Sequence, residues 1–72
     1  MKIYNVMQYG AKGDGKTNDA FSIQHAIDDC AKNGGGQVVL PSGYTFYSDS
    51  IRLKKNVDFH IQKGATIKAT SN

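Results

Sequence analysis

The sequence predicts a mostly β protein built as a β-solenoid, with one amphipathic helix that caps its N-terminal end. Two observations lead to this prediction: a β-rich segment in the second half of the chain repeats at a fixed offset, and a helical pattern of apolar residues precedes it. The chain has 72 residues and is 39% hydrophobic, as globular domains are. We expect one incomplete domain over 1–72, with a strand and a glycine-rich loop at 1–17, the capping helix at 18–33 and the first two coils at 36–72.

The first element is expected to be a strand over 3–9, IYNVMQY, which is rich in residues that favour β structure. The next stretch, GAKGDGKT at 10–17, fits the pattern G-x-x-x-x-G-K-[ST] of nucleotide-binding phosphate loops. In such a loop the helix begins at the Gly-Lys-Thr, so that its amides face the phosphates. Here the helix begins later, and Asp14 and Asp19 place negative charge close by. We interpret 10–17 as a turn, and a nucleotide-binding loop at Gly10–Thr17 is the least favoured alternative.

The helix is the clearest local pattern in the chain. Asn18 is a suitable N-cap, and the glycines that follow Asn33 end the helix, because glycine takes the left-handed cap conformation without strain. Since Cys30 lies within the apolar stripe, we expect it to be a small buried hydrophobic residue and not a nucleophile. The stripe follows the i, i+3, i+4, i+7, i+8 spacing of one helix face and comprises Ile23, Ala26, Ile27, Cys30 and Ala31.

The repeat joins residues 36–48, GQVVLPSGYTFYS, to residues 57–69, VDFHIQKGATIKA, without a gap and at an offset of 21 residues. Short strands joined by a recurring glycine turn indicate solenoid coils, which bury their apolar faces only by stacking on one another. We expect residues 50–53 to form a third short strand of the coil, and the helix to cover the open edge and core of the first coil. The aligned pairs are Val38 with Phe59, Leu40 with Ile61, Gly43 with Gly64, Thr45 with Thr66, and Phe46 with Ile67.

Composition argues against several classes of protein. The net charge is +3, but the lysines are spread along the chain, so we expect no nucleic-acid partner. No apolar run is long enough for a membrane span, so we expect no membrane partner. No run resembles a signal peptide either, so we expect the protein to be cytoplasmic, or to have lost a signal peptide before this sequence begins. Cys30 is the only cysteine, and His25 and His60 lie far apart in sequence, so we expect no disulfide, metal or cofactor.

Three stretches carry a resemblance to a known family. They are V-x-x-Y-G-A-K-G-D-G-K-T-N-D at 6–19, Ile23-Gln24-x-Ala26-Ile27, and G-G-G-x-V-x-L-P-x-G at 34–43. Together they resemble the start of pectin-lyase-like right-handed parallel β-helix proteins. The segment from Ser50 through Ile67 is most similar to glycoside hydrolase family 28, the polygalacturonases. The resemblance covers residues 4–72, and its first half is shared with viral tail spikes and with uronan lyases and epimerases.

The resemblance implies that a longer parent protein hydrolyses α-linked galacturonate or rhamnogalacturonan with inversion, with pectin, an acidic polysaccharide, as its partner. This chemistry needs an acid and a base about 6.5–9.5 Å apart. In the family, those aspartates lie on later coils, and their motifs do not occur in this sequence. Asp28 and Asp29 are adjacent, but consecutive helical positions point about 100° apart, so they cannot flank one glycosidic bond. We therefore expect no catalytic, cofactor-binding or metal-binding residue in this chain.

Two hypotheses about function stay open. In the first, the chain is the N-terminal cap and the first coils of a pectin-degrading glycosidase. In the second, it is a non-catalytic module, either tail-spike-like or assembled by coil stacking. Because solenoids usually need at least three repeats, we expect self-association through the exposed coil edge or partial unfolding. Arg52, Lys54 and Lys55 are interpreted as solvated surface, and Asn56 as the start of a ladder of stacked asparagines in later coils.

Overall fold

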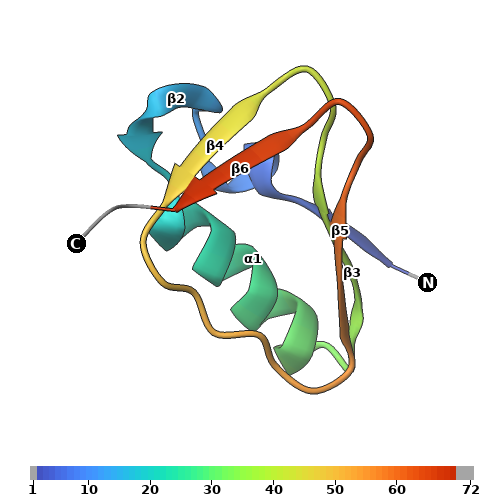
Figure 1. Ribbon diagram of the computed structural model, residues 1–72. Coiled ribbons are helices and arrows are strands. Elements are labelled where there is room, and N and C mark those ends of the chain that lie inside the picture. Colours follow the sequence, from blue (N-terminus) through green and yellow to red (C-terminus); the bar gives the residue numbers. More distant parts are fainter. Residues whose placement is uncertain (1, 70–72) are drawn as a thin grey trace.

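The computed structural model describes residues 2–69. Its strands stack into two parallel three-stranded sheets, ordered β1-β3-β5 and β2-β4-β6. Figure 1 shows these sheets as two sides of a coil, with segment 49–56 returning along the third side beside the helix α1. The elements are β1 Ile3–Asn5, the 3-10 helix η1 Val6–Tyr9, β2 Asp14–Asn18, α1 Ala20–Lys32, β3 Gly36–Leu40, β4 Thr45–Ser48, β5 Val57–Ile61 and β6 Thr66–Ala69.

The repeat in the sequence is the register of the coils. Strands β3 and β5 pair with Val38 opposite Phe59, and β4 and β6 pair with Phe46 opposite Ile67, so each position meets the residue 21 places later. The glycine turns stack as well, because the amide of Gly43 donates to the carbonyl of Gly64 at 3.2 Å. The predicted alignment is therefore confirmed at every paired position of these four strands.

The apolar face of α1 packs into the coil interior. Cys30 is fully buried there, as predicted, whereas Ala31 is only half-buried. Burial raises the pKa of the Cys30 thiol, which agrees with its interpretation as a hydrophobic core residue. The largest fully buried side chains are Val6, Ile23, Ile27, Cys30, Val38, Leu40 and Phe46.

Two predictions for the N-terminal segment were wrong. The expected strand over 3–9 ends at Asn5, because the Asn5 side chain accepts a hydrogen bond from the amide of Met7 at 2.9 Å and starts the 3-10 helix. The glycine-rich stretch is not only a turn, since β2 runs from Asp14 to Asn18 and pairs with β4. Strands β1 and β2 therefore pair with β3 and β4 and cover their N-terminal edges, which we had expected the helix to cover.

The predicted third strand at 50–53 is also absent, because its backbone bonds to the helix instead of to another strand. The amide of Arg52 donates to Gln24 Oε1 at 2.7 Å, and Gln24 Nε2 donates to the Arg52 carbonyl at 3.0 Å. The helix itself begins two residues later than expected, at Ala20, and the Asn18 side chain accepts from the Ala20 amide at 3.1 Å.

Asn56 has a φ of 66° and is the one non-glycine with positive φ among the described residues. The position 21 residues earlier is Gly35, with a φ of 104°, so each coil makes this turn in the left-handed region. We expect Asn56→Gly to be neutral or stabilising, and Asn56→Ala to lower the free energy of unfolding by about 1 kcal/mol. Urea denaturation of both variants checks this. Equal destabilisation by glycine and alanine would instead assign the role of Asn56 to its side chain. The asparagine ladder concerns later coils and stays a prediction.

Candidate functional site

Asp28 and Asp29 are bound by separate partners on the surface of α1. Asp28 Oδ1 lies 2.8 Å from Lys54 Nζ and accepts a hydrogen bond from Gln24 Nε2 at 3.0 Å. Asp29 Oδ2 accepts from the Tyr9 hydroxyl at 2.8 Å. The first carboxylate therefore fastens the returning segment 49–56, and the second fastens η1. They do not converge on a common cleft.

The electrostatics of these groups agree with a structural role. The Lys54 ammonium, helped by Gln24, lowers the pKa of Asp28. Burial, and next the hydrogen bond to the Asp29 carboxylate, raise the pKa of Tyr9 to about 12. An efficient general acid or base has a pKa near the working pH. Both shifts move the pKa further from pH 7, so neither Asp28 nor Tyr9 is suited to act as a general acid or base.

The glycine-rich loop binds a carboxylate of its own chain where a phosphate loop would hold a phosphate. Asp14 Oδ1 accepts hydrogen bonds from the amides of Lys16 at 2.9 Å and Thr17 at 2.8 Å. Asp14 Oδ2 accepts from the Thr17 hydroxyl at 2.9 Å. These are the amides and the hydroxyl that the Gly-Lys-Thr pattern would offer to a nucleotide.

Asp19 fills the other half of the loop. Asp19 is 2% exposed as a residue, and its carboxylate accepts hydrogen bonds from the amides of Lys12 at 2.9 Å and Gly13 at 3.0 Å. Two internal anions therefore occupy four amides of the loop, and a phosphate would have to displace negative charge to enter. This arrangement argues against nucleotide binding at 10–17 and explains why the pattern occurs here.

The hydrogen bonds from the Thr17 and Lys16 amides lower the pKa of Asp14 to about 2 from the ordinary 3.8. A lowered folded-state pKa stabilises the fold above the unfolded value, and this contribution is lost as the pH falls from about 3.8 towards 2. We expect the Asp14 carboxyl to titrate near pH 2 in an NMR titration. We also expect Asp14→Asn to abolish that part of the acid dependence of unfolding. A midpoint near 3.8 would show that these bonds do not persist in solution.

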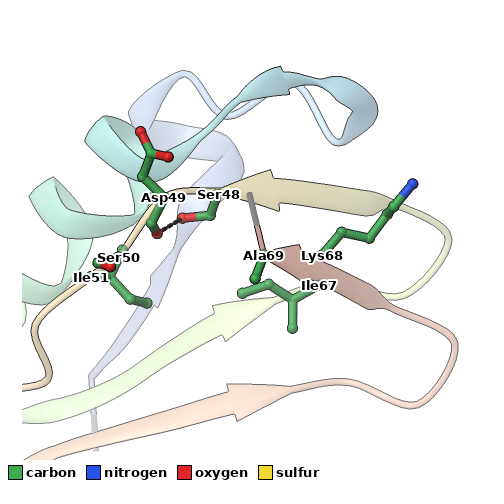
Figure 2. Close-up of a pocket in the computed structure, with 7 residues that line it drawn as sticks. All are labelled: Ser48, Asp49, Ser50, Ile51, Ile67, Lys68 and Ala69. Carbon is green, nitrogen blue, oxygen red and sulfur yellow. Dashed lines mark hydrogen bonds between the residues drawn. The ribbon is translucent and has the colours of Figure 1, made fainter. Parts of the chain in front are cut away.

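A hollow of 310 Å³ opens between the turn that follows β4 and the strand β6. In Figure 2 the Ser48 hydroxyl donates to the Asp49 carbonyl, at 2.7 Å, and the Lys68 side chain extends away from the other labelled side chains. Asp49 supplies the only carboxylate among the described lining residues, so this hollow lacks the acid–base pair of an inverting glycosidase. The lining residues are Ser48, Asp49, Ser50, Ile51, Ile67, Lys68 and Ala69.

A neighbouring hollow of 420 Å³ shares Asp49 with the first. Here Asn18 connects two elements, because its Nδ2 donates to Asp49 Oδ2 at 2.6 Å while its Oδ1 accepts from the amides of Ala20 and Asp49. Asp49 is thus held in place by the last residue of β2. Asp49 is again the only carboxylate among the described residues that line this second hollow, so it too lacks an acid–base pair.

Within residues 2–69, no three His, Cys, Asp or Glu side chains gather closely enough to hold a metal ion. In the same part of the chain, no helix is long and apolar enough to cross a membrane. The basic side chains Arg52, Lys54 and Lys55 are exposed, and Lys54 is paired with Asp28.

Sequence reasoning missed the hydrogen bonds of Asp14 and Asp19 within the loop and the contact of Asn18 with Asp49. The spacing of Asp14 and Thr17 is a usable signal, because aspartate often bonds to backbone amides two and three residues ahead. Asp19 gave no such signal, since it accepts from amides six and seven residues earlier and depends on how the loop folds back.

Comparison with known proteins identifies the family. A family model described as rhamnogalacturonase A/epimerase, pectate lyase-like, matches residues 3–72. The chain belongs to this family. The predicted start of a right-handed parallel β-helix with one capping helix is thereby confirmed, as is the similarity to the polygalacturonases of glycoside hydrolase family 28.

Three individual relatives illustrate what the chain is similar to. The exo-poly-alpha-D-galacturonosidase of Dickeya chrysanthemi is 38% identical over 71 residues, which are 99% of this chain and 11% of that protein. Alginate lyase 7 of Azotobacter vinelandii is 65% identical over 40 residues, 56% of this chain and 5% of that protein. The family 28 exopolygalacturonase of Yersinia enterocolitica superposes with a TM-score of 0.88 at 38% identity, over 96% of this chain and 12% of that one. The chain thus spans only 5% to 12% of these relatives.

Proposed function

We propose that this chain forms the N-terminal cap and first two coils of a longer β-helix glycosidase that hydrolyses pectic polysaccharide, polygalacturonan or rhamnogalacturonan. The chain would then be one incomplete domain. The observation that carries the proposal is the similarity to the galacturonosidase of Dickeya chrysanthemi, which runs through 99% of this chain at 38% identity. The superposition on the family 28 exopolygalacturonase supports the same substrate class.

The role of the 72 residues in such an enzyme is structural. Their carboxylates fasten loops: Asp14 and Asp19 hold the glycine-rich loop, and Asp28 holds segment 49–56. An inverting hydrolase needs one carboxylic acid to protonate the leaving oxygen and one carboxylate to activate water. We assign both groups to coils beyond this segment, so the 72-residue chain alone is expected to be inert.

The intact mass of the natural gene product in its host is the first test. We expect a mass several times the 7.8 kDa of this chain. The product should then release reducing ends from polygalacturonate or rhamnogalacturonan, with an inverted anomeric centre detectable by NMR. The isolated 72-residue chain serves as the inactive control. A natural mass near 7.8 kDa would contradict the proposal and leave the non-catalytic assembly module as the function.

A uronan lyase or epimerase is the second candidate, favoured by the 65% identity to alginate lyase 7. That similarity covers 40 residues only, whereas the galacturonosidase matches nearly all of the chain. The products separate the two candidates. A lyase leaves an unsaturated uronate that absorbs ultraviolet light, an epimerase changes monomer composition without cutting the chain, and a hydrolase does neither.

A further inference from the structure

Asn33 is the one asparagine of this sequence that is followed by a glycine. An asparagine side chain can lose its amide without an enzyme, because the backbone nitrogen of the next residue attacks the side-chain carbon Cγ. Glycine has no side chain to shield that nitrogen, so an Asn-Gly pair is the most reactive case. Asn33 and Gly34 are both exposed where α1 ends. The chain therefore presents this chemistry at the C-terminal end of its capping helix.

The attacking nitrogen is held in a helix-ending motif. The Gly34 amide donates to the Ala31 carbonyl at 3.2 Å, and the Gly35 amide donates to the Cys30 carbonyl at 2.8 Å. These two bonds, with Gly34 in the left-handed region at a φ of 93°, make a Schellman motif. While the motif is formed, the Gly34 nitrogen is bound and cannot attack.

The Asn33 side chain is held as well. Its Nδ2, the nitrogen that has to leave, donates to the Asp29 carbonyl at 2.9 Å. The ψ of Asn33 is 19°, so the Gly34 nitrogen lies nearly eclipsed with the backbone nitrogen of Asn33. Attack on Cγ closes a five-membered ring, which requires the Gly34 nitrogen to turn towards Cβ instead. The last turn of α1 must therefore open before the reaction can occur.

This opening can be local. Helix ends open at a much smaller free-energy cost than the whole fold does. The part of the turn that is tied to the next coil begins only after Gly34, since the Gly36 amide donates to the Asn56 carbonyl at 3.1 Å. The sheet order β1-β3-β5 already places the turn before β3 beside the turn before β5. A further coil would stack beyond β5 and would leave the contacts of Asn33 unchanged.

We propose that Asn33 is a site of spontaneous deamidation, and that local opening of the Schellman motif sets its rate. In the open turn, hydroxide removes the Gly34 amide proton, and the nitrogen forms a bond to Cγ of Asn33. The bond from Cγ to Nδ2 breaks, and this nitrogen leaves as ammonia after taking a proton from water. Water then opens the succinimide ring at either carbonyl and returns a proton to the Gly34 nitrogen. The product is aspartate or isoaspartate.

The product weakens the end of the helix. It replaces the Nδ2 donor by a carboxylate beside the Asp29 carbonyl, and negative charge is unfavourable at a helix C-terminus. Isoaspartate also lengthens the backbone by one carbon before Gly34, which moves both amides of the Schellman motif. Modified chains should therefore unfold at a lower urea concentration than unmodified chains. The inference does not rest on the proposed glycosidase.

Timed incubation of the full natural gene product at mildly alkaline pH tests the proposal. Digestion at low pH and mass spectrometry follow the exchange of amide for carboxylate at Asn33, in the folded protein and in guanidinium chloride. We expect the folded protein to react about tenfold to a hundredfold more slowly, because several hydrogen bonds must break first. Gly35→Ala strains the motif but keeps the Asn33–Gly34 pair. It should raise the folded rate about tenfold and leave the unfolded rate unchanged.

Two controls separate local from global opening. Leu40→Ala removes a fully buried side chain at the far end of β3 and lowers the stability of the whole fold. It should change the deamidation rate by less than about twofold. Hydrogen exchange of the Gly34 amide needs no variant, and its protection should match the ratio of unfolded to folded deamidation rates within about threefold.

Three results would overturn the proposal. The first is equal acceleration by Gly35→Ala and Leu40→Ala, which would make the opening global. The second is an equal rate in the folded and the unfolded protein, which would mean that the motif gives no protection. The third is a folded protein that carries no product at Asn33 after the unfolded protein has converted completely.

Discussion

Replacing Gly35 by alanine is expected to lower the free energy of unfolding by roughly 2–5 kcal/mol, from about 1–2 kcal/mol for a Cβ in the left-handed region plus about 1–3 kcal/mol for overpacking. Gly35 has a φ of 104°, and a Cβ there would lie 2.5 Å from the Asn56 carbonyl oxygen and 2.8 Å from the Asn56 Cβ. The first of these atoms is backbone, so relief requires moving the next coil. Urea denaturation followed by circular dichroism measures the effect.

The neighbouring Gly34 provides a matched control. Its φ is 93°, but a Cβ at this position would meet no atom within 4 Å. Gly34→Ala should therefore show only the cost of the left-handed conformation, about 1–2 kcal/mol. Equal losses for the two variants would mean that the close stacking of Gly35 on Asn56 is not maintained in solution.

Replacing Phe46 by alanine is expected to cost about 3–5 kcal/mol, as for other large aromatic residues in protein cores. Phe46 is fully buried, and its strand neighbour in the next coil is Ile67. From the average stability per residue of globular proteins, a chain of 72 residues has a free energy of unfolding of about 4–11 kcal/mol. The variant should thus lose a large share of the total stability, as seen by a lower midpoint of urea denaturation.

Phe21→Ala removes the same side chain from a site that is 85% exposed. Surface substitutions usually change stability by less than about 0.5 kcal/mol. A difference of several kcal/mol between the two phenylalanines is the expected result. A large loss for Phe21→Ala would show instead that this side chain is covered in solution, for example by a second copy.

The periodic features of the chain could be predicted from its residues. The offset of 21 residues, the helix with Cys30 on its buried face and the capping position of that helix were all visible, because stacked coils must place like residues over like and a buried helix face must recur every three or four residues. The separation of Asp28 from Asp29 followed in the same way from helix geometry.

The irregular parts depend on contacts between distant residues. Strand β2 exists because β4 offers it a partner, and segment 50–53 is not a strand because Gln24 of the helix takes its backbone bonds. The bonds of Asp19 could not be predicted from the sequence, since its carboxylate reaches back to the amides of Lys12 and Gly13. The periodicity of the sequence predicts which side of a helix or strand is buried. The hydrogen-bond partner of each polar group depends on which distant segments lie next to it in the folded chain, and periodicity does not contain that information.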